Sequence, residues 1–155
     1  MVADRARNGD APILPAPPGG AVRTAHSAGM AGGGGTGSVA IVDDDALVRT
    51  AMAGLLRSLG LPSDAFASAH EYLCSPMDGV ACIVCDVQMP GTDGVQLLRM
   101  LRRNGIATPM ILMTAFPNGR VRADAMAAGA AGYLEKPVNL EELIGCLELV
   151  LGCFR

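Results

Sequence analysis

The chain has 155 residues, of which half are hydrophobic and 17% are charged, and its net charge is −3. This length favours a single domain, and the composition is sufficient for a buried core. The small net charge gives no basic surface of the kind that binds nucleic acid, and the sequence shows no signal peptide and no membrane-spanning run. We therefore expect a cytoplasmic protein whose partners include neither nucleic acid nor membrane.

Residues 1–37 differ in composition from the rest of the chain. The runs PAPPGG (15–20) and AGGGGTGS (31–38) favour neither helix nor strand and can bury little area. The glycine run lacks the Gly-Lys-Ser/Thr ending of a phosphate-binding loop, and no strand precedes it. We interpret residues 1–37 as a flexible arm or an expression-derived leader, and residues 38–155 as one folded domain.

From residue 38 onward, short apolar runs alternate with segments of helical periodicity. The apolar runs predict strands at 38–42, 63–67, 81–85, 109–113 and 130–135. The other segments predict helices at 46–59, 68–75, 93–104 and 117–128, and a last helix from residue 139. Such alternation is typical of βαβ units, in which helices cover both faces of a parallel sheet. The predicted fold is a doubly wound α/β domain, (βα)5, with a five-stranded parallel sheet in a three-layer sandwich.

Polar residues mark several helix ends. Asp45 and Asp93 are expected N-caps, and Asn139 with Glu142 three residues later has the spacing of a capping box. Asn104-Gly105 predicts the end of the third helix.

The five cysteines form an odd set, which suits a reducing compartment. Cys82 and Cys85 make a CxxC pattern, but they lie within a predicted strand, where residues three apart point to opposite faces. We therefore interpret both as buried core residues rather than as a redox or metal-binding pair.

Polar residues also follow the carboxyl ends of four predicted strands. Asp43 and Asp44 follow the first strand, Asp86 the third, Thr114 the fourth and Lys136 the fifth. Taken singly, each is more often a cap, a turn residue or a solvated charge. Because the carboxyl ends of parallel strands form one edge of a sheet, where ligands bind in open α/β folds, their joint placement favours a functional site.

The chemistry of this set points to phosphoryl transfer. Three crowded carboxylates need a cation, and oxygen ligands suit Mg²⁺, with Mn²⁺ or Ca²⁺ as substitutes in vitro. Lys136 is the only lysine, against eleven arginines, and its ammonium acts as a compact point charge. Metal and ammonium would neutralise the transferring oxygens, and Asp86 could serve as the nucleophile that forms an acyl phosphate.

Four motifs now become recognisable: IVDDD at 41–45, DVQMPGTDG at 86–94, MTAF at 113–116 and GYLEKP at 132–137. In combination they resemble the CheY-like receiver domain of two-component response regulators, and the resemblance covers residues 38 to about 152. It implies a flavodoxin-like or CheY-like fold. It also implies a signalling protein that catalyses only its own phosphorylation and dephosphorylation.

The resemblance assigns roles to individual residues. Asp86 is implied to be the phosphoacceptor, which receives its phosphoryl group from a histidine kinase or a histidine phosphotransfer protein. Asp43 and Asp44 match the acidic pair that holds Mg²⁺, together with Asp86 and the backbone carbonyl of Gln88.

A second group of residues is implied to bind the phosphoryl group and to switch. Thr114 matches the switch hydroxyl, the backbone N–H of Ala115 lies beside it, and Lys136 matches the lysine that pairs with the phosphoryl oxygens. Tyr133 matches an aromatic residue that turns inward when Thr114 moves. The bond before Pro137 is expected to be cis.

Two positions depart from the family pattern. Val138 stands where many relatives have Phe, and Phe116 is bulky and apolar where an acid or an amide is possible. Phosphorylation is expected to rearrange the face formed by residues 109–137, including the weakly amphipathic helix at 117–128. The output would then be binding of a downstream protein or self-association.

Two other classes of protein stay open at this point. A phosphatase or phosphotransferase of the haloacid dehalogenase type also forms an aspartyl phosphate, but it needs a second Asp where this chain has Gln88. A receiver-like scaffold that is never phosphorylated is the other alternative, and the intact acidic, hydroxyl and lysine positions argue against it.

Overall fold

The computed structural model describes residues 37–152, and within them it contains one parallel sheet and five helices. The strands are β1 (Ser38–Val42), β2 (Ser63–Phe66), β3 (Val80–Asp86), β4 (Met110–Thr114) and β5 (Gly132–Glu135). The helices are α1 (Ala46–Ser58), α2 (Ala69–Leu73), α3 (Gly94–Arg103), α4 (Gly119–Ala127) and α5 (Leu140–Leu151). The predicted N-terminal arm, apart from Gly37, lies outside the described residues.

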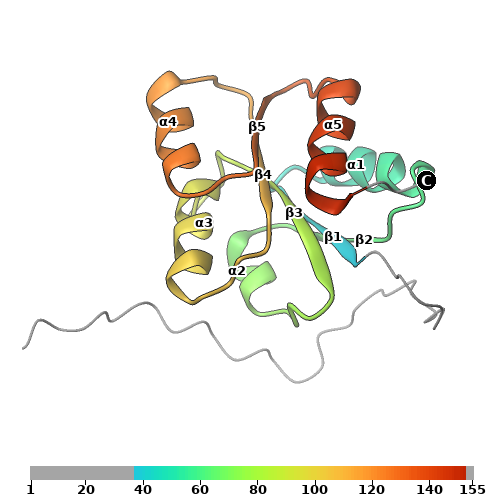
Figure 1. Ribbon diagram of the computed structural model, residues 1–155, viewed down its shortest axis with the longest axis horizontal. Helices are drawn as coiled ribbons and strands as arrows, with labels where there is room; N and C mark the ends of the chain where they lie inside the picture. The colour runs from blue at the N-terminus through green and yellow to red at the C-terminus, as the bar shows by residue number, and fades with distance from the viewer. Residues whose placement is uncertain (1–36, 153–155) are drawn as a thin grey trace, which may run out of the picture.

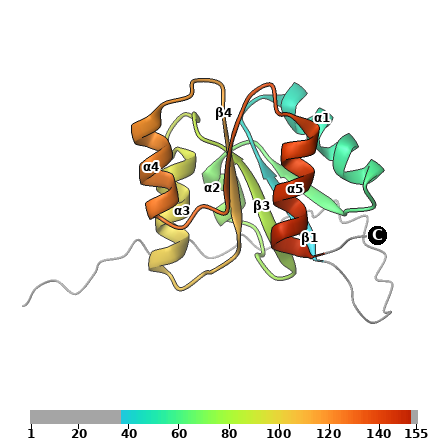
Figure 2. The same ribbon diagram turned by 45° about the horizontal axis from the view of Figure 1, so that its top comes forward.

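The strand order is β2-β1-β3-β4-β5, and every pairing is parallel. Helices α2, α3 and α4 cover one face of the sheet, while α1 and α5 cover the other (Figures 1 and 2). The chain leaves β1 toward β2 on one side and then returns to place β3 on the other side. The carboxyl ends of β1 and β3 therefore form the switch point of a doubly wound sheet, where a ligand crevice is expected. The predicted fold is confirmed.

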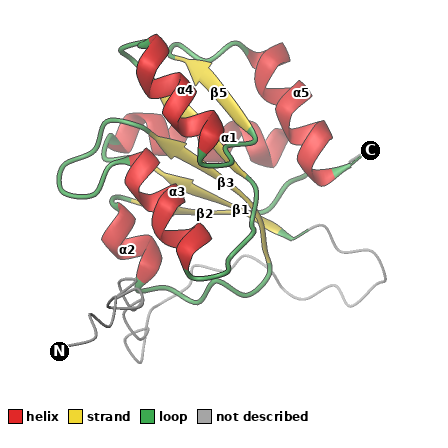
Figure 3. Cartoon of the chain, turned by 60° about the vertical axis from the view of Figure 1, so that its left-hand side comes forward, coloured by secondary structure: helices red, strands yellow, loops and turns green. Residues whose placement is uncertain are grey.

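Two hydrophobic clusters fill the space between the sheet and its two helical layers; Figure 3 shows the arrangement of the sheet and the helices. Successive residues of each strand contribute to opposite clusters because strand side chains alternate between faces. Cys85 packs with the α2–α3–α4 layer and Cys82 with the α1–α5 layer. The prediction that these two cysteines point to opposite faces is confirmed.

Helix caps set the boundaries of several elements. Asp45 and Asp93 cap α1 and α3 as predicted, and Asp93 forms a reciprocal capping box with Gln96. The fourth helix begins at Gly119 rather than at residue 117, because the Asn118 side chain accepts hydrogen bonds from the first turn. Among the described helices, none combines the length and the apolar character that a bilayer span needs.

The fifth strand begins at Gly132, two residues later than predicted. Gly129 has a positive φ of 99°, and the Ala130 N–H donates to the Ala125 carbonyl at 3.0 Å. This is the glycine-terminated end of α4, so Ala130 belongs to the helix terminus and not to the strand. The Ala131 N–H then donates to the Met110 carbonyl and starts the pairing with β4.

Gly94 lets α3 approach β3 closely. A Cβ at this position would lie 2.5 Å from the Asp86 carbonyl oxygen and 2.9 Å from Leu112 Cδ2. We predict that Gly94→Ala lowers the free energy of unfolding by about 1–3 kcal/mol, the usual cost of overpacking. Denaturant unfolding checks this. Gly54→Ala in α1 is the control, because its Cβ would meet nothing within 4 Å and helix propensity should stabilise that variant by roughly 0.5–1 kcal/mol. Equal unfolding midpoints for the two variants would contradict the prediction.

Candidate functional site

The sheet register brings the acidic residues together. Val42 of β1 lies beside Cys85 of β3, so the next residues along each strand, Asp43 and Asp86, are neighbours at the sheet edge. Asp44 follows in the loop after β1. One carboxylate oxygen from each of Asp43, Asp44 and Asp86 lies within 4.8 Å of the others.

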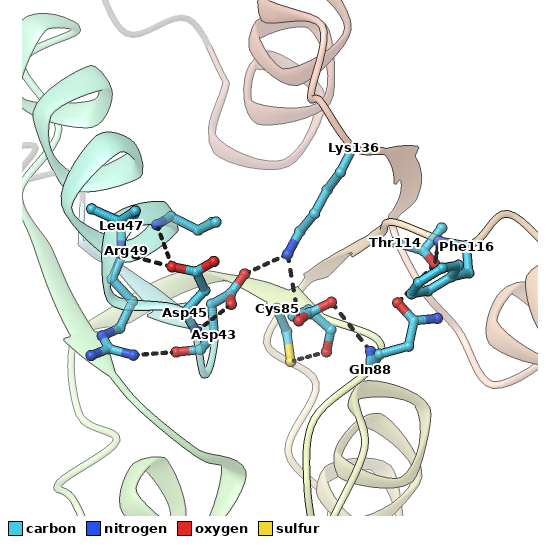
Figure 4. A network of polar contacts seen from close by, with 11 residues as sticks. Asp43, Asp45, Leu47, Arg49, Cys85, Gln88, Thr114, Phe116 and Lys136 are labelled. Carbon is cyan, nitrogen blue, oxygen red and sulfur yellow. Dashed lines mark hydrogen bonds and ion pairs between the residues drawn. The ribbon is translucent and has the colours of Figure 1, made fainter.

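Lys136 reaches this cluster from the end of β5, an edge strand of the sheet. It follows β5, and its long side chain extends over the ends of β4 and β3 to the acids (Figure 4). Its Nζ lies 2.8 Å from Asp43 Oδ2 and 3.4 Å from Asp86 Oδ2. Burial disfavours the charged ammonium, but the hydrogen bond to Asp43 and the charges of both carboxylates outweigh burial, so the pKa of Lys136 is raised.

Lys136 only partly offsets the effects that disfavour the charged form of Asp86. Burial and the charge of Asp43 raise the pKa of Asp86, while the Lys136 ammonium and the hydrogen bond from the Gln88 backbone N–H act in the opposite direction. The net effect is a raised pKa, and burial is its largest cause.

The donor set fits a hard divalent cation. The cluster is made of carboxylates, and Asp44 is exposed whereas Asp43 is fully buried. Asp43 already accepts hydrogen bonds at both oxygens, from the Asp45 N–H at 2.9 Å and from Lys136. Asp86 likewise has a donor at each oxygen, the Gln88 N–H at 3.2 Å and Lys136 Nζ at 3.4 Å, so the exposed Asp44 is the most accessible of the three carboxylates. An oxygen-only site that is open to water suits Mg²⁺.

The loop between β1 and α1 is held by a contact that the sequence reasoning did not anticipate. Arg49, in the first turns of α1, donates from Nη1 to the Asp43 carbonyl oxygen at 2.7 Å (Figure 4). Asp45 caps the same helix through the N–H groups of Leu47 and Val48. Together these contacts fix the direction in which Asp43 leaves the strand.

Thr114 lies at the end of β4, where it is fully buried. Its hydroxyl donates to Gln88 Oε1 at 3.0 Å and accepts from the Phe116 backbone N–H at 3.0 Å. The structure thus places Thr114 on the predicted sheet edge but directs its hydroxyl toward Gln88. The sequence reasoning gave Gln88 a role only through its backbone carbonyl. The Asp86–Met113 pairing, which puts the ends of β3 and β4 side by side, is the feature that brings these two side chains together.

The remaining predicted residues lie around β5 and the end of β4. Tyr133 is buried, its hydroxyl has no hydrogen-bond partner in the described structure, and the Arg122 guanidinium lies 5.9 Å from its ring centroid. The Lys136–Pro137 peptide bond is cis. Ala115 is exposed directly after Thr114.

The fold and the edge cluster define a doubly wound signalling domain of the CheY-like class. The chain belongs to the response regulator receiver family, because the family model described as the response regulator receiver domain matches residues 39–148. The acidic cluster of this domain is compatible with Mg²⁺ binding.

Individual relatives agree with this assignment. The chain is 39% identical to the transcriptional regulatory protein FixJ of Azorhizobium caulinodans, over 74% of this chain and 54% of that protein. It is 38% identical to nodulation protein W of Bradyrhizobium diazoefficiens, over 68% of this chain and 47% of that protein. The chain thus spans about half the length of such relatives.

Solved structures give the same result. A response regulator receiver protein from Burkholderia phymatum is 42% identical, with a TM-score of 0.65, over 75% of this chain and 95% of that one. The FixJ-N crystal structure is 33% identical, with a TM-score of 0.67, over 74% and 93% of the two chains.

Proposed function

We propose that this receiver accepts a phosphoryl group on Asp86 from the phosphohistidine of a kinase or a histidine phosphotransfer protein. A carboxylate oxygen of Asp86 attacks phosphorus, the bond from phosphorus to the histidine nitrogen breaks, and an acyl phosphate forms. The observation that carries the proposal is the meeting of three carboxylates and the chain's only lysine at the switch point of the sheet.

Asp43, Asp44 and the Gln88 backbone carbonyl would hold Mg²⁺ beside Asp86. When bound, the ion would supply positive charge that offsets the charge on the transferring oxygens. Lys136, already 3.4 Å from Asp86 Oδ2, would supply a second positive charge. The Thr114 hydroxyl and the Ala115 backbone N–H would bind phosphoryl oxygens once the group is in place.

The output would be a changed binding surface on α4, β5 and α5. A groove there is lined by residues that include Tyr133, Met126 and Leu149. Met126 and Leu149 are exposed, and helix α4 contributes only Ala125 as a fully buried residue. A weakly anchored helix beside exposed apolar side chains supports a partner-binding or self-association face that phosphorylation shifts.

We also propose residues 38–155 as the domain unit, with residues 1–37 as an appended arm. Action in the cytoplasm is supported by the free thiols of the described cysteines, which suit a reducing compartment.

The test is intact-mass measurement after incubation with a small phosphodonor such as acetyl phosphate. We expect the mass of one added phosphoryl group in the presence of Mg²⁺ and no gain when EDTA removes the ion. Sustained hydrolysis of phosphomonoesters would instead indicate a phosphatase of the haloacid dehalogenase type. No gain under either condition would indicate a receiver-like scaffold.

A further inference from the structure

One hydrogen bond at the sheet edge has no part in the reaction proposed above. The Thr114 hydroxyl donates to Gln88 Oε1 and accepts from the Phe116 N–H, each at 3.0 Å. Thr114 is fully buried, whereas Gln88 is exposed in the loop between β3 and α3. Figure 4 shows the Gln88 side chain directed toward Thr114 and Phe116, on the side of the site opposite Asp45.

The hydroxyl has a single proton and can donate one hydrogen bond at a time. A phosphoryl group on Asp86 presents acceptor oxygens, so Thr114 can bind it only by donating that proton. The Phe116 N–H occupies the hydroxyl as an acceptor and does not supply another donor. Donation to Gln88 and donation to a phosphoryl oxygen are therefore mutually exclusive.

We propose that the Gln88 side-chain amide competes with the phosphoryl group for the Thr114 hydroxyl and so stabilises the unphosphorylated state. Gln88 is then a positioning residue, which sets how much binding free energy the phosphoryl group must supply before Thr114 engages it. This inference rests on the proposed phosphorylation of Asp86. The same residue also contacts Asp86 through its backbone N–H, at 3.2 Å from Oδ1, and a side-chain substitution leaves that contact in place.

The test uses beryllium fluoride with Mg²⁺, a complex that mimics a phosphoryl group on a carboxylate, and measures its affinity by calorimetry. Gln88→Leu removes the acceptor with little change in size, and it should raise the affinity about two- to tenfold, as expected for the loss of one competing hydrogen bond. Gln88→Glu keeps an acceptor oxygen and should show no such rise.

A double-mutant cycle with Thr114→Val, which removes the hydroxyl, tests the route of the effect. In the Thr114→Val background, Gln88→Leu should change the affinity no further. The same gain in both backgrounds would show that the effect bypasses Thr114 and would overturn the proposal.

Intact mass with acetyl phosphate, measured on the same proteins, separates the two proposals. If the wild type gains a phosphoryl group while Gln88→Leu binds the mimic no more tightly than the wild type, the competition is wrong and the proposed function stands. If the wild type neither binds the mimic nor gains mass, the proposed function fails and the competition fails with it.

Discussion

In Mg²⁺-free buffer, replacing Lys136 by Met is expected to lower the free energy of unfolding by about 3 kcal/mol, because removing one partner of a buried ion pair leaves the other charge uncompensated. Asp43 is fully buried and its Oδ2 lies 2.8 Å from Lys136 Nζ. Met has a similar length but no charge. Added Mg²⁺ should restore part of the lost stability by supplying positive charge to the same carboxylates.

Denaturant unfolding with and without Mg²⁺ measures this effect. Arg120→Met on α4 is the matched control, since it removes an exposed charge and should change stability by less than about 0.5 kcal/mol. Lys136→Arg keeps the charge and should impair the response to phosphorylation more than the stability, because a planar guanidinium fork replaces a point charge. A fully stable Lys136→Met protein in EDTA would contradict the role given to the ion pair.

Replacing Asp86 by Asn is expected to abolish uptake of a phosphoryl group while the fold is retained. The Asn side chain has nearly the same shape, but its amide nitrogen replaces the carboxylate oxygen that attacks phosphorus. Because burial and the charge of Asp43 raise the pKa of Asp86, removing this negative charge should leave stability unchanged or raise it in the absence of Mg²⁺.

Intact mass and a denaturant curve, recorded on the same sample, check both parts of this expectation. Asp124→Asn on α4 is the control, since Asp124 is an exposed acid outside the edge cluster and its replacement should leave phosphoryl uptake in place. A phosphorylated Asp86→Asn protein would show that another residue is the acceptor.

Most of the fold follows from patterns that a single sequence carries. Alternating apolar runs and helical stripes predict the parallel sheet with two helical layers, and Asp45 and Asp93 predict two helix starts. The errors lie at the element boundaries, which local contacts determine. The Asn118 side chain caps α4, so this helix begins later than predicted. Gly129 has a positive φ and ends the same helix, so Ala130 belongs to the helix terminus rather than to β5.

The candidate site was predictable where the backbone alone positions a residue. Parallel pairing puts Asp43 and Asp86 side by side regardless of their rotamers, and a lysine after β5 is long enough to reach them. The Gln88–Thr114 hydrogen bond depends on the side-chain torsions of a loop residue and of the last residue of β4, 26 positions apart in sequence, and periodicity does not encode these torsions. The contact from Arg49 to the Asp43 carbonyl depends on a side-chain torsion in the same way.

Locating the phosphoryl group on the chain tests the central claim most directly. Borohydride reduces an acyl phosphate on Asp to homoserine, and peptide mass spectrometry then identifies the modified position. After incubation with acetyl phosphate and Mg²⁺, homoserine is expected at position 86. Homoserine at another Asp, or none in a protein that has gained phosphoryl mass, would contradict the assignment of Asp86 as the acceptor.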